Sequence, residues 1–251
     1  MDSIEAYRFF LKDSIRKSID FRLTDQSRGV PAPPVEKPVD PRQPRFRLPD
    51  FDLFSKTIPK ADLLSAMAGR KSRRIFAAAP LSLEELAFLL WATQGVRPSG
   101  NSPVFRTVPS AGARHSFETY LFIRHVQGLE RGLYRFLPVE NELLLLAADG
   151  DLGAKLVDAC FGQSFVARGA ATFVWATLPY RMEWRYGLAA HRVILLDAGH
   201  VCQNLYLACE AVGAGTCAVG AYDQEKLDRL LGVDGEEEFA VYLAPVGKLK
   251  P

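Results

Sequence analysis

The segment GRKSRRIF (69–76) gathers cations around a single hydroxyl group. Arg70, Lys71, Ser72 and Arg74 stand within five residues of one another, just before an apolar pair. Fork-shaped guanidinium groups and a hydroxyl suit a phosphate group or the anionic edge of a ring. A solvated basic surface explains the same residues equally well. The segment therefore indicates either an anion-binding site or an ordinary charged face.

A second segment, VPSAGA (108–113), is rich in small residues. It contains Pro109, Ser110, Ala111 and Gly112. Glycine and alanine allow a flat ligand to approach the backbone, and serine and exposed N–H groups can donate hydrogen bonds to it. Taken alone, the residues favour the simpler interpretation of an ordinary loop.

A polar row lies within the long apolar segment 189–213. Asp197, His200 and Asn204 are spaced i, i+3 and i+7, which places them on one face of a helix. Buried polar groups need hydrogen-bond partners, so we expect a structural network that joins this helix to another. The sequence shows no Ser-His-Asp order and no His pair at metal-ligand spacing, and we predict no metal site.

The segment GAGTCA (213–218) fits the pattern G-x-G-x-x-A of dinucleotide-binding sites. That motif needs a strand before it and a helix after it, whereas here a long helix precedes it and β-prone residues follow. We therefore predict no Rossmann site, and we interpret Gly213 and Gly215 as a helix C-cap and a turn.

The elements that must position these segments mix helices with strands and lack regular βαβ alternation, which predicts the α+β class. Ser82 and Glu85 form a capping box at the start of a helix that Gly95 ends, and Gly69 is expected to terminate a shorter helix. The predicted helices are 3–20, 60–68, 82–94, 151–161, 189–213 and 223–231. The predicted strands are 118–126, 131–138, 141–148, 169–180, 215–222 and 238–248, of which 131–148 forms a hairpin.

Composition excludes several classes of protein. The 251 residues carry 31 Lys and Arg against 29 Asp and Glu, and this balance gives no global case for nucleic-acid binding. No apolar run reaches the roughly 18 residues that a membrane span needs, and the charged N-terminus is not a signal peptide, so we expect a cytoplasmic protein. The four cysteines are expected to be buried and reduced. The proline-rich segment 30–50 is predicted to drape over a folded body as an extended connector.

The ordered series of motifs resembles one family. GRKSRRIF followed by LSLEELAFLLWATQG is similar to the N-terminal signature of nitroreductase-like flavoproteins. RTVPSAGARHSFETYLFI, GLYRFLP, FGQSFVARGAATFVWAT and HRVILLDAGHVCQNLYLACEAVGAG, in that order, resemble the SagB-type dehydrogenases. This branch includes the flavin oxidases that turn azolines into thiazoles and oxazoles in modified peptides. The resemblance covers about residues 57–248.

This resemblance implies a nitroreductase-like α+β fold, with a central, mostly antiparallel sheet flanked by helices. It implies an FMN-binding domain over 57–251, an N-terminal extension over 1–56, and a homodimer with FMN at its interface. Arg70, Ser72 and Arg74, with Lys71 alongside, would hold the FMN phosphate, ribityl chain and ring edge. The turn from Pro109 to Gly112 would lie against the isoalloxazine ring. Gly220 and Ala221 in VGAY resemble a second cofactor-contacting segment, and Lys248 matches a basic position near the phosphate.

One position departs from the pattern of the azoline oxidases, which carry a Lys-Tyr pair before the long helix. Here the corresponding residues are Arg185 and Tyr186, our two candidate catalytic residues. Arginine hardly gives up a proton and is a poor general base. Tyr186 could donate a proton or position substrate, or simply form an aromatic pocket wall.

Three hypotheses about function follow. The first is an FMN-dependent oxidoreductase that acts on a small molecule or a modified peptide, with NAD(P)H as a candidate electron donor. The second is a non-catalytic flavin-binding or scaffolding member of a peptide-modification complex. The third is an anion- or nucleic-acid-binding module that uses the basic residues of 42–47 and 69–74.

Overall fold

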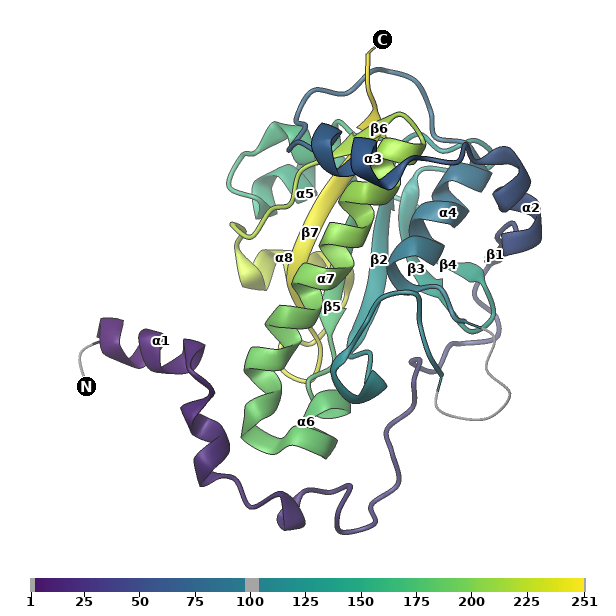
Figure 1. Ribbon diagram of the computed structural model, residues 1–251. Coiled ribbons are helices and arrows are strands. Elements are labelled where there is room, and N and C mark those ends of the chain that lie inside the picture. The colour runs from purple at the N-terminus through teal and green to yellow at the C-terminus, as the bar shows by residue number, and fades with distance from the viewer. Residues whose placement is uncertain (1–2, 98–103, 251) are drawn as a thin grey trace.

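A seven-stranded antiparallel sheet forms the centre of the protein (Figure 1). The computed structural model describes residues 3–97 and 104–250. The strand order is β1-β4-β3-β2-β5-β7-β6, and every neighbouring pair is antiparallel. The strands are β1 (Arg45–Arg47), β2 (Phe117–Ile123), β3 (Gly132–Leu137), β4 (Glu142–Ala147), β5 (Ala171–Thr177), β6 (Ala214–Thr216) and β7 (Phe239–Lys248).

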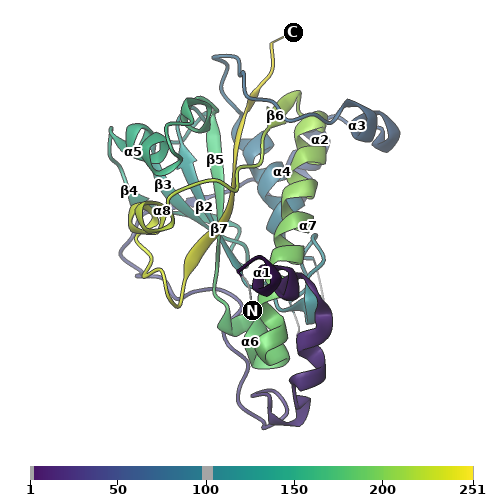
Figure 2. The same ribbon diagram turned by 90° about the vertical axis from the view of Figure 1, so that its left-hand side faces the viewer.

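Helices cover both faces of this sheet, as Figure 2 shows. On one side lie α4 and α7, and on the other lie α5 and α8. The helices are α1 (Ser3–Leu11), α2 (Phe51–Thr57), α3 (Leu63–Gly69), α4 (Leu83–Gln94), α5 (Leu152–Ala159), α6 (Tyr180–Tyr186), α7 (Ala190–Ala211) and α8 (Gln224–Leu231). Short 3₁₀ turns connect several of them. The predicted α+β class and the 131–148 hairpin are confirmed.

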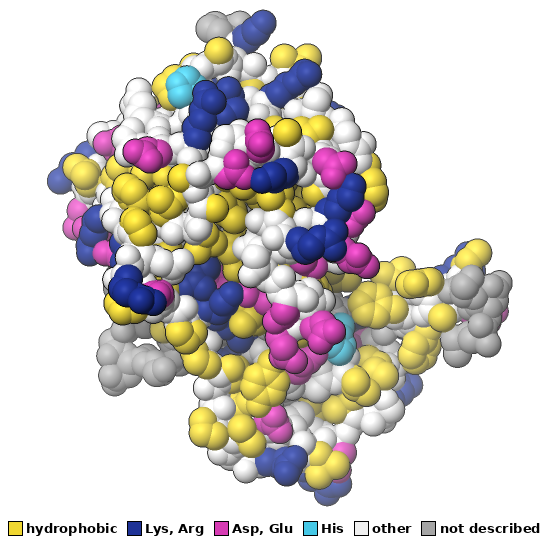
Figure 3. Space-filling model, turned by 180° about the vertical axis from the view of Figure 1, so that it is seen from behind, with side chains coloured by type: hydrophobic (Ala, Val, Ile, Leu, Met, Phe, Trp, Pro, Cys, Tyr) yellow, Lys and Arg dark blue, Asp and Glu magenta, His cyan; other side chains and the backbone are white. Residues whose placement is uncertain are grey.

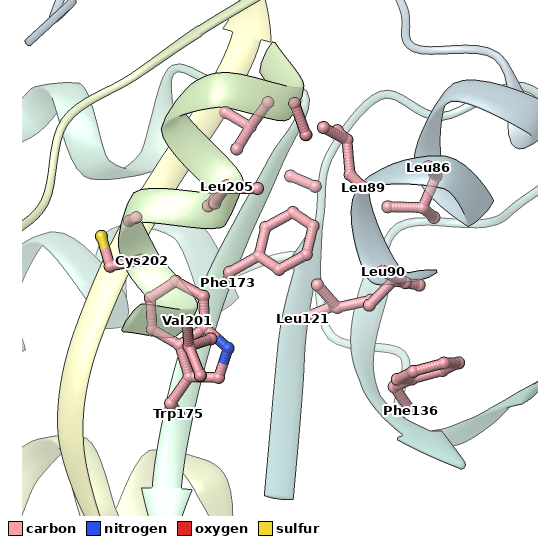
Figure 4. Close-up of a cluster of buried hydrophobic side chains, with 14 of the residues drawn as sticks. Leu86, Leu89, Leu90, Leu121, Phe136, Phe173, Trp175, Val201, Cys202 and Leu205 are labelled. Carbon is pink, nitrogen blue, oxygen red and sulfur yellow. The ribbon is translucent and has the colours of Figure 1, made fainter. Parts of the chain in front are cut away.

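The larger part of the core lies between the sheet and the pair α4 and α7 (Figure 4). The capping box of α4 is present as predicted, since Ser82 Oγ accepts from the Glu85 N–H and the Glu85 carboxylate accepts from the Ser82 N–H. The predicted stripe of α7 is buried in this core, from Ile194 to Val212. The labelled side chains that meet there are Leu86, Leu89, Leu90, Leu121, Phe136, Phe173, Trp175, Val201, Cys202 and Leu205.

The proline-rich connector lies over the folded body as predicted, and buried charges fasten it there. Arg106 donates to the carbonyl of Val35, and Arg181 donates to the carbonyl of Pro34. Arg181 also pairs with the buried carboxylate of Glu118 at 2.6 Å. Because a buried charge without a partner is costly, these contacts fix the path of the connector.

Several predicted boundaries were wrong, for reasons that lie in tertiary contacts. The helix predicted over 3–20 ends at Leu11, because Arg192 donates to the Leu11 carbonyl and pairs with Asp13, and a 3₁₀ turn (Asp13–Ser18) follows. Gly69 is the last residue of α3 rather than its terminator.

Two predicted strands are also shorter than expected. The strand predicted over 169–180 stops at Thr177, since Pro179 caps the start of α6, which the sequence analysis missed. The strand predicted over 215–222 is only Ala214–Thr216, and Gly215 is a strand residue rather than a turn residue. Gly213, with φ of +59°, follows the C-cap of α7 as predicted.

Part of the predicted extension over 1–56 joins the main body. The short strand β1 pairs with β4, and α2 packs against α4. Neither element was predicted. In contrast, α1 projects to one side of the body in Figure 1, and the carbonyl of its last residue, Leu11, accepts from Arg192 of α7. Among the helices that the structure describes, none is long and apolar enough to cross a membrane.

Candidate functional site

The basic segment 70–77 lies along the edge strand β6. Ser72 forms a β-bridge with Thr216, and the Arg73 N–H donates to the Thr216 carbonyl at 2.8 Å. A Cβ added to Gly215 would lie 2.6 Å from Arg73 Cγ, so only glycine permits this close approach. The Ala77 N–H donates to the Lys248 carbonyl, which extends the contact to β7. The sheet therefore fixes the backbone that carries the predicted anion-binding residues.

Tyr206 of α7 organises two of these side chains. Its hydroxyl lies 3.0 Å from Ser72 Oγ and accepts a hydrogen bond from the Ala218 N–H at 2.9 Å. The Arg70 guanidinium lies over its ring, 5.3 Å from the centroid. The sequence analysis missed Tyr206, because no local pattern shows which face of α7 meets the basic segment.

The cations of this segment have no acidic partner among the described residues. No carboxylate there lies within 4.0 Å of the charged nitrogens of Arg70, Lys71, Arg73 or Arg74. Arg73 Nε is buried and makes no hydrogen bond with the described protein groups. The Arg74 guanidinium lies over the Phe165 ring at 5.6 Å. A cluster of uncompensated cations with a hydroxyl beside it fits a phosphate-bearing ligand.

The turn 108–113 packs against α7. The Ala111 N–H donates to the carboxylate of Asp197 at 3.2 Å, and burial raises the pKa of that carboxyl above its usual range. Gly112, with φ of +57°, takes the left-handed conformation that glycine adopts readily. Ala113 and His115 also have positive φ, and the Ser110 hydroxyl accepts from the His115 N–H. The turn is thus held in a strained shape by specific hydrogen bonds.

His115 lies beneath this turn and was not singled out from the sequence. Burial, together with the nearby cations of Arg106 and Arg114, lowers the pKa of His115 to about 3. The imidazole is therefore neutral at ordinary pH and adds no charge to the site.

The polar row on α7 divides between two contacts. Asn204 donates to the Ala92 carbonyl of α4 at 2.9 Å, so the predicted link to another helix is confirmed for this residue, whereas Asp197 holds the turn instead. His200 is exposed, with Nδ1 4.0 Å from Asp197. Its expected membership of the network was wrong, because the side chain is exposed and makes no hydrogen bond with the described residues.

Arg185 and Tyr186 meet the small-residue turn. A Cβ added to Gly112 would lie 2.7 Å from both Arg185 Nε and the Tyr186 hydroxyl. Arg185 donates to Gln26 of the N-terminal segment at 3.1 Å. Two segments that are more than 70 residues apart in the chain are therefore in contact, as a shared site requires.

The basic segment and the small-residue turn occupy separate positions along α7. The turn contacts Asp197 and the basic segment contacts Tyr206, nine residues further on. At a rise of 1.5 Å per residue, these contacts are about 14 Å apart along the helix.

The remaining predicted cofactor positions lie near β6 and β7. Gly220 and Ala221 are exposed, and the Ala221 carbonyl accepts from Gln163 at 2.9 Å. Lys248 donates to Glu85 at 2.7 Å and to the Val212 carbonyl, so its ammonium group already has two partners. Among the described residues, the cations of the Arg70–Arg74 cluster therefore lack acidic partners, whereas Lys248 has one. The predicted contacts of all these residues with FMN stay predictions.

One cavity of the described structure contains none of the predicted cofactor-binding or catalytic residues. It has a volume of about 580 Å³ and is lined mainly by apolar side chains of α2, α3, α4 and α7. Among the described residues, no group of three His, Cys, Asp or Glu side chains could hold a metal ion. All four cysteines are buried free thiols, as predicted.

Comparison with known proteins identifies the family. The model of the nitroreductase family matches residues 67–248. The chain belongs to this family. Membership indicates an oxidoreductase and agrees with the resemblance drawn from the motifs. The family match begins after α2, so the N-terminal residues up to 66 lie outside it.

Individual relatives support this assignment. The chain is 33% identical over 203 residues to "Putative nitroreductase MJ1384" of Methanocaldococcus jannaschii, which covers 81% of this chain and 96% of that protein. A nitroreductase crystal structure from Ralstonia eutropha has a TM-score of 0.68 at 26% identity, over 88% of this chain and 99% of that one. One from Anabaena variabilis has a TM-score of 0.67 at 24% identity, over 84% of this chain and only 42% of that one.

Two more distant structures share the fold. The Escherichia coli microcin synthetase McbBCD complex, with truncated pro-MccB17 bound, has a TM-score of 0.60 at 17% identity, over 80% of this chain and 83% of that one. The NADPH:FMN oxidoreductase of Vibrio harveyi, complexed with NAD⁺, has a TM-score of 0.53 at 15% identity, over 75% and 69% respectively. At these identities the likeness shows the fold alone.

Proposed function

We propose that this nitroreductase-family chain is an FMN-dependent oxidoreductase that transfers hydride between a donor and a small-molecule or modified-peptide substrate. The observation that carries the proposal is the basic segment on the edge of the sheet. Its cations lack acidic partners among the described residues, and Arg73 Nε is buried without a hydrogen bond. A bound phosphate group would supply the missing negative charge.

The residues present fit FMN in a consistent arrangement. Arg70, Ser72 and Arg74, with Lys71 alongside, would hold the phosphate, ribityl chain and ring edge. The turn from Pro109 to Gly112 would lie against the ring, since its small residues allow close approach. FMN, when bound, supplies hydride transfer, and the protein supplies its placement and electrostatics. A cation of the segment, Lys71 or Arg74, would favour the negative charge of the reduced cofactor.

A homodimer is part of the same proposal. Apolar side chains are exposed on α1, α3 and α7. Exposed apolar patches of this kind are typical of surfaces that bind another protein. These side chains are Ile4, Tyr7, Leu11, Leu63, Leu64, Met67, Leu195 and Leu196. A second copy that covers α7 would also bring one chain's basic segment and the other chain's turn to a single cofactor.

Arg185 and Tyr186 would act on the substrate side. A guanidinium group is a poor general base, so Arg185 would orient an anion or a polar group and would not act as the base that lysine provides in azoline oxidases. Tyr186 could donate a proton or position substrate. We therefore propose turnover of small electron acceptors such as quinones or nitroaromatics, and little or no oxidation of azoline peptides.

The alternative role is a non-catalytic flavin-binding or scaffolding member of a peptide-modification complex. Two observations are consistent with this role: Arg185 stands where azoline oxidases have lysine, and the chain shares its fold with the microcin synthetase complex. A nucleic-acid module receives less support. On the face that Figure 3 shows, Lys and Arg side chains are interspersed with Asp and Glu, and a continuous basic stripe is absent among the described residues there.

Anaerobic reduction and reoxidation of the purified protein test the proposal. NADH or NADPH should bleach the flavin absorbance band, and a quinone should restore it with repeated turnover. Bound flavin that exchanges no electrons with NAD(P)H, quinones or azoline peptides would support the scaffolding role instead.

A further inference from the structure

Two arginines lie close to the small-residue turn. Arg185 Nε lies beside Gly112, as described above. Arg114 follows Gly112 by two residues, and its guanidinium lies 5.0 Å from the centroid of the Trp184 ring. Trp184 and Arg185 are adjacent in the last turn of α6, so this helix end carries both contacts.

The two guanidinium groups are not neutralised by the described part of the chain. No carboxylate in residues 3–97 or 104–250 lies within 4.0 Å of either group. Arg185 donates only to the neutral amide of Gln26, and Arg114 Nε is buried without a hydrogen bond. Burial and the charge of Arg185 together lower the pKa of Arg114 from its ordinary value. Two like charges are held close together without compensation, which an anionic ligand would relieve.

Nearby arginines on the same side of the molecule show the contrast. Arg16 pairs with Asp13 at 2.7 Å, and Arg192 pairs with the same carboxylate at 3.4 Å. The buried carboxylate of Asp197 accepts from the Ala111 N–H at the turn. Arg114 and Arg185 therefore lack the carboxylate partner that Arg16 and Arg192 share.

Aromatic rings hold both groups in place. The Arg114 guanidinium lies over Trp184, and the Arg185 guanidinium lies 5.6 Å from the Tyr186 centroid. Stacking leaves the N–H edge of a guanidinium free to bind a carboxylate through two parallel hydrogen bonds. The Tyr186 hydroxyl, beside Gly112, adds a third donor.

We propose that the substrate of this site carries a carboxylate, bound by Arg114 and Arg185, while its reacting part lies over the Gly112 turn. The inference rests on the proposed function and assigns a substrate class to it. It makes Arg114 a substrate-binding residue, although the sequence motifs did not single it out. It also gives Arg185 a role that needs its permanent charge rather than a proton transfer.

A matched pair of probes tests this assignment: 4-nitrobenzoate and its methyl ester, which differ in the charge of one group. Isothermal titration calorimetry of the purified protein should show tighter binding of the acid than of the ester. Arg114→Gln and Arg185→Gln should each weaken binding of the acid by about ten- to a hundredfold, as expected for loss of a charge-assisted hydrogen bond. Binding of the ester should stay unchanged.

Two control variants distinguish the loss of charge at this site from misfolding and from the loss of any surface arginine. Arg185→Lys should retain part of the affinity for the acid, since it keeps the charge but loses the fork. Arg131 is an exposed arginine just before β3, and Arg131→Gln should change the binding of neither the acid nor the ester. In steady-state reduction, both glutamine variants should raise KM for the acid more than KM for the ester.

Several results would overturn the inference. Equal binding of acid and ester by the wild type would do so without any variant. A loss confined to NADPH, with 4-nitrobenzoate unaffected, would assign the arginines to the electron donor. Calorimetry reports carboxylate binding whether or not the protein turns over. Failure of the proposed function is therefore detected separately, by the absence of flavin from the purified protein.

Discussion

Gly112 lies so close to Arg185 that a methyl group on its Cα would come within 2.7 Å of the Arg185 Nε atom. The contact joins the small-residue turn to the end of α6. Gly112 is required for two reasons: its φ is +57°, and there is no room for a side chain at this position. The positions of Arg185 and Tyr186 therefore depend on the absence of a single Cβ.

Gly112→Ala should destabilise the fold and displace the pair. Alanine at positive φ costs about 1–2 kcal/mol of unfolding free energy. Gly128→Ala is the matched control, because Gly128 has a φ of +80° and nothing within 4 Å of an added Cβ. Chemical denaturation should show a similar backbone penalty in both variants, but only Gly112→Ala should weaken binding of 4-nitrobenzoate. Equal ligand binding by the two variants would contradict the proposed contact.

Leu196→Arg should convert the proposed dimer into a monomer. Leu195 and Leu196 are 50% and 51% exposed on α7, within the surface that a second copy would cover. Interfaces of obligate homodimers commonly bury more than about 2,000 Å², and a charge at their centre is poorly tolerated. Sedimentation or light scattering at micromolar concentration measures the change. Val139→Arg, at an exposed apolar residue in the β3–β4 turn, should remain dimeric. A wild-type monomer that still holds flavin would refute the dimer.

Glu36→Gln should remove a pH dependence of stability. Burial, together with a hydrogen bond to Glu140, raises the pKa of Glu36 to about 8. The folded protein therefore holds a proton that the unfolded chain has lost, and the free energy of unfolding falls as pH rises from about 4.5 to about 8. Glutamine stays neutral at every pH. Urea denaturation near pH 5 and pH 9 should show a smaller decline for Glu36→Gln than for wild type.

The exposed Glu237→Gln is the control for that experiment, and it should leave the wild-type decline intact. An identical decline in Glu36→Gln and wild type would show that Glu36 is ionised in the folded protein across this range.

Arg70→Ala should weaken FMN binding. The variant loses a charge-assisted bond worth about 1.5–3 kcal/mol, or roughly ten- to over a hundredfold in affinity. Fluorescence titration of the apoprotein with FMN provides the measurement. Arg229→Ala removes an exposed arginine on α8 that pairs only with Glu225, and its affinity should match wild type. Unchanged affinity in Arg70→Ala would count against the assignment of the basic segment.

Local signals in the sequence predicted much of the fold. The Ser82–Glu85 capping box, the hairpin over 131–148 and the apolar stripe of α7 each depend on residues near one another in the chain. The structure bears out all three. In contrast, α6 was missed because the strand predicted over 169–180 ran past its end at Thr177 to the first residue of this short helix. The strand β1 exists only because β4 offers an edge to pair with.

The candidate site shows the same division. The motifs pointed to the basic segment and to the turn, but not to the residues that hold them. Tyr206 and Asp197 contact these segments from α7, and Arg114 becomes notable only when Trp184 and Arg185 are placed beside it. Such contacts join residues 70 to 134 positions apart, and periodicity or short motifs carry no signal for them.

The cofactor content of the purified protein tests the central claim most directly. An absorbance spectrum, with mass identification of the released small molecule and its quantity per chain, is the measurement. The account predicts a yellow protein with a flavin spectrum and one FMN per chain. A colourless protein that also fails to bind added FMN would contradict it.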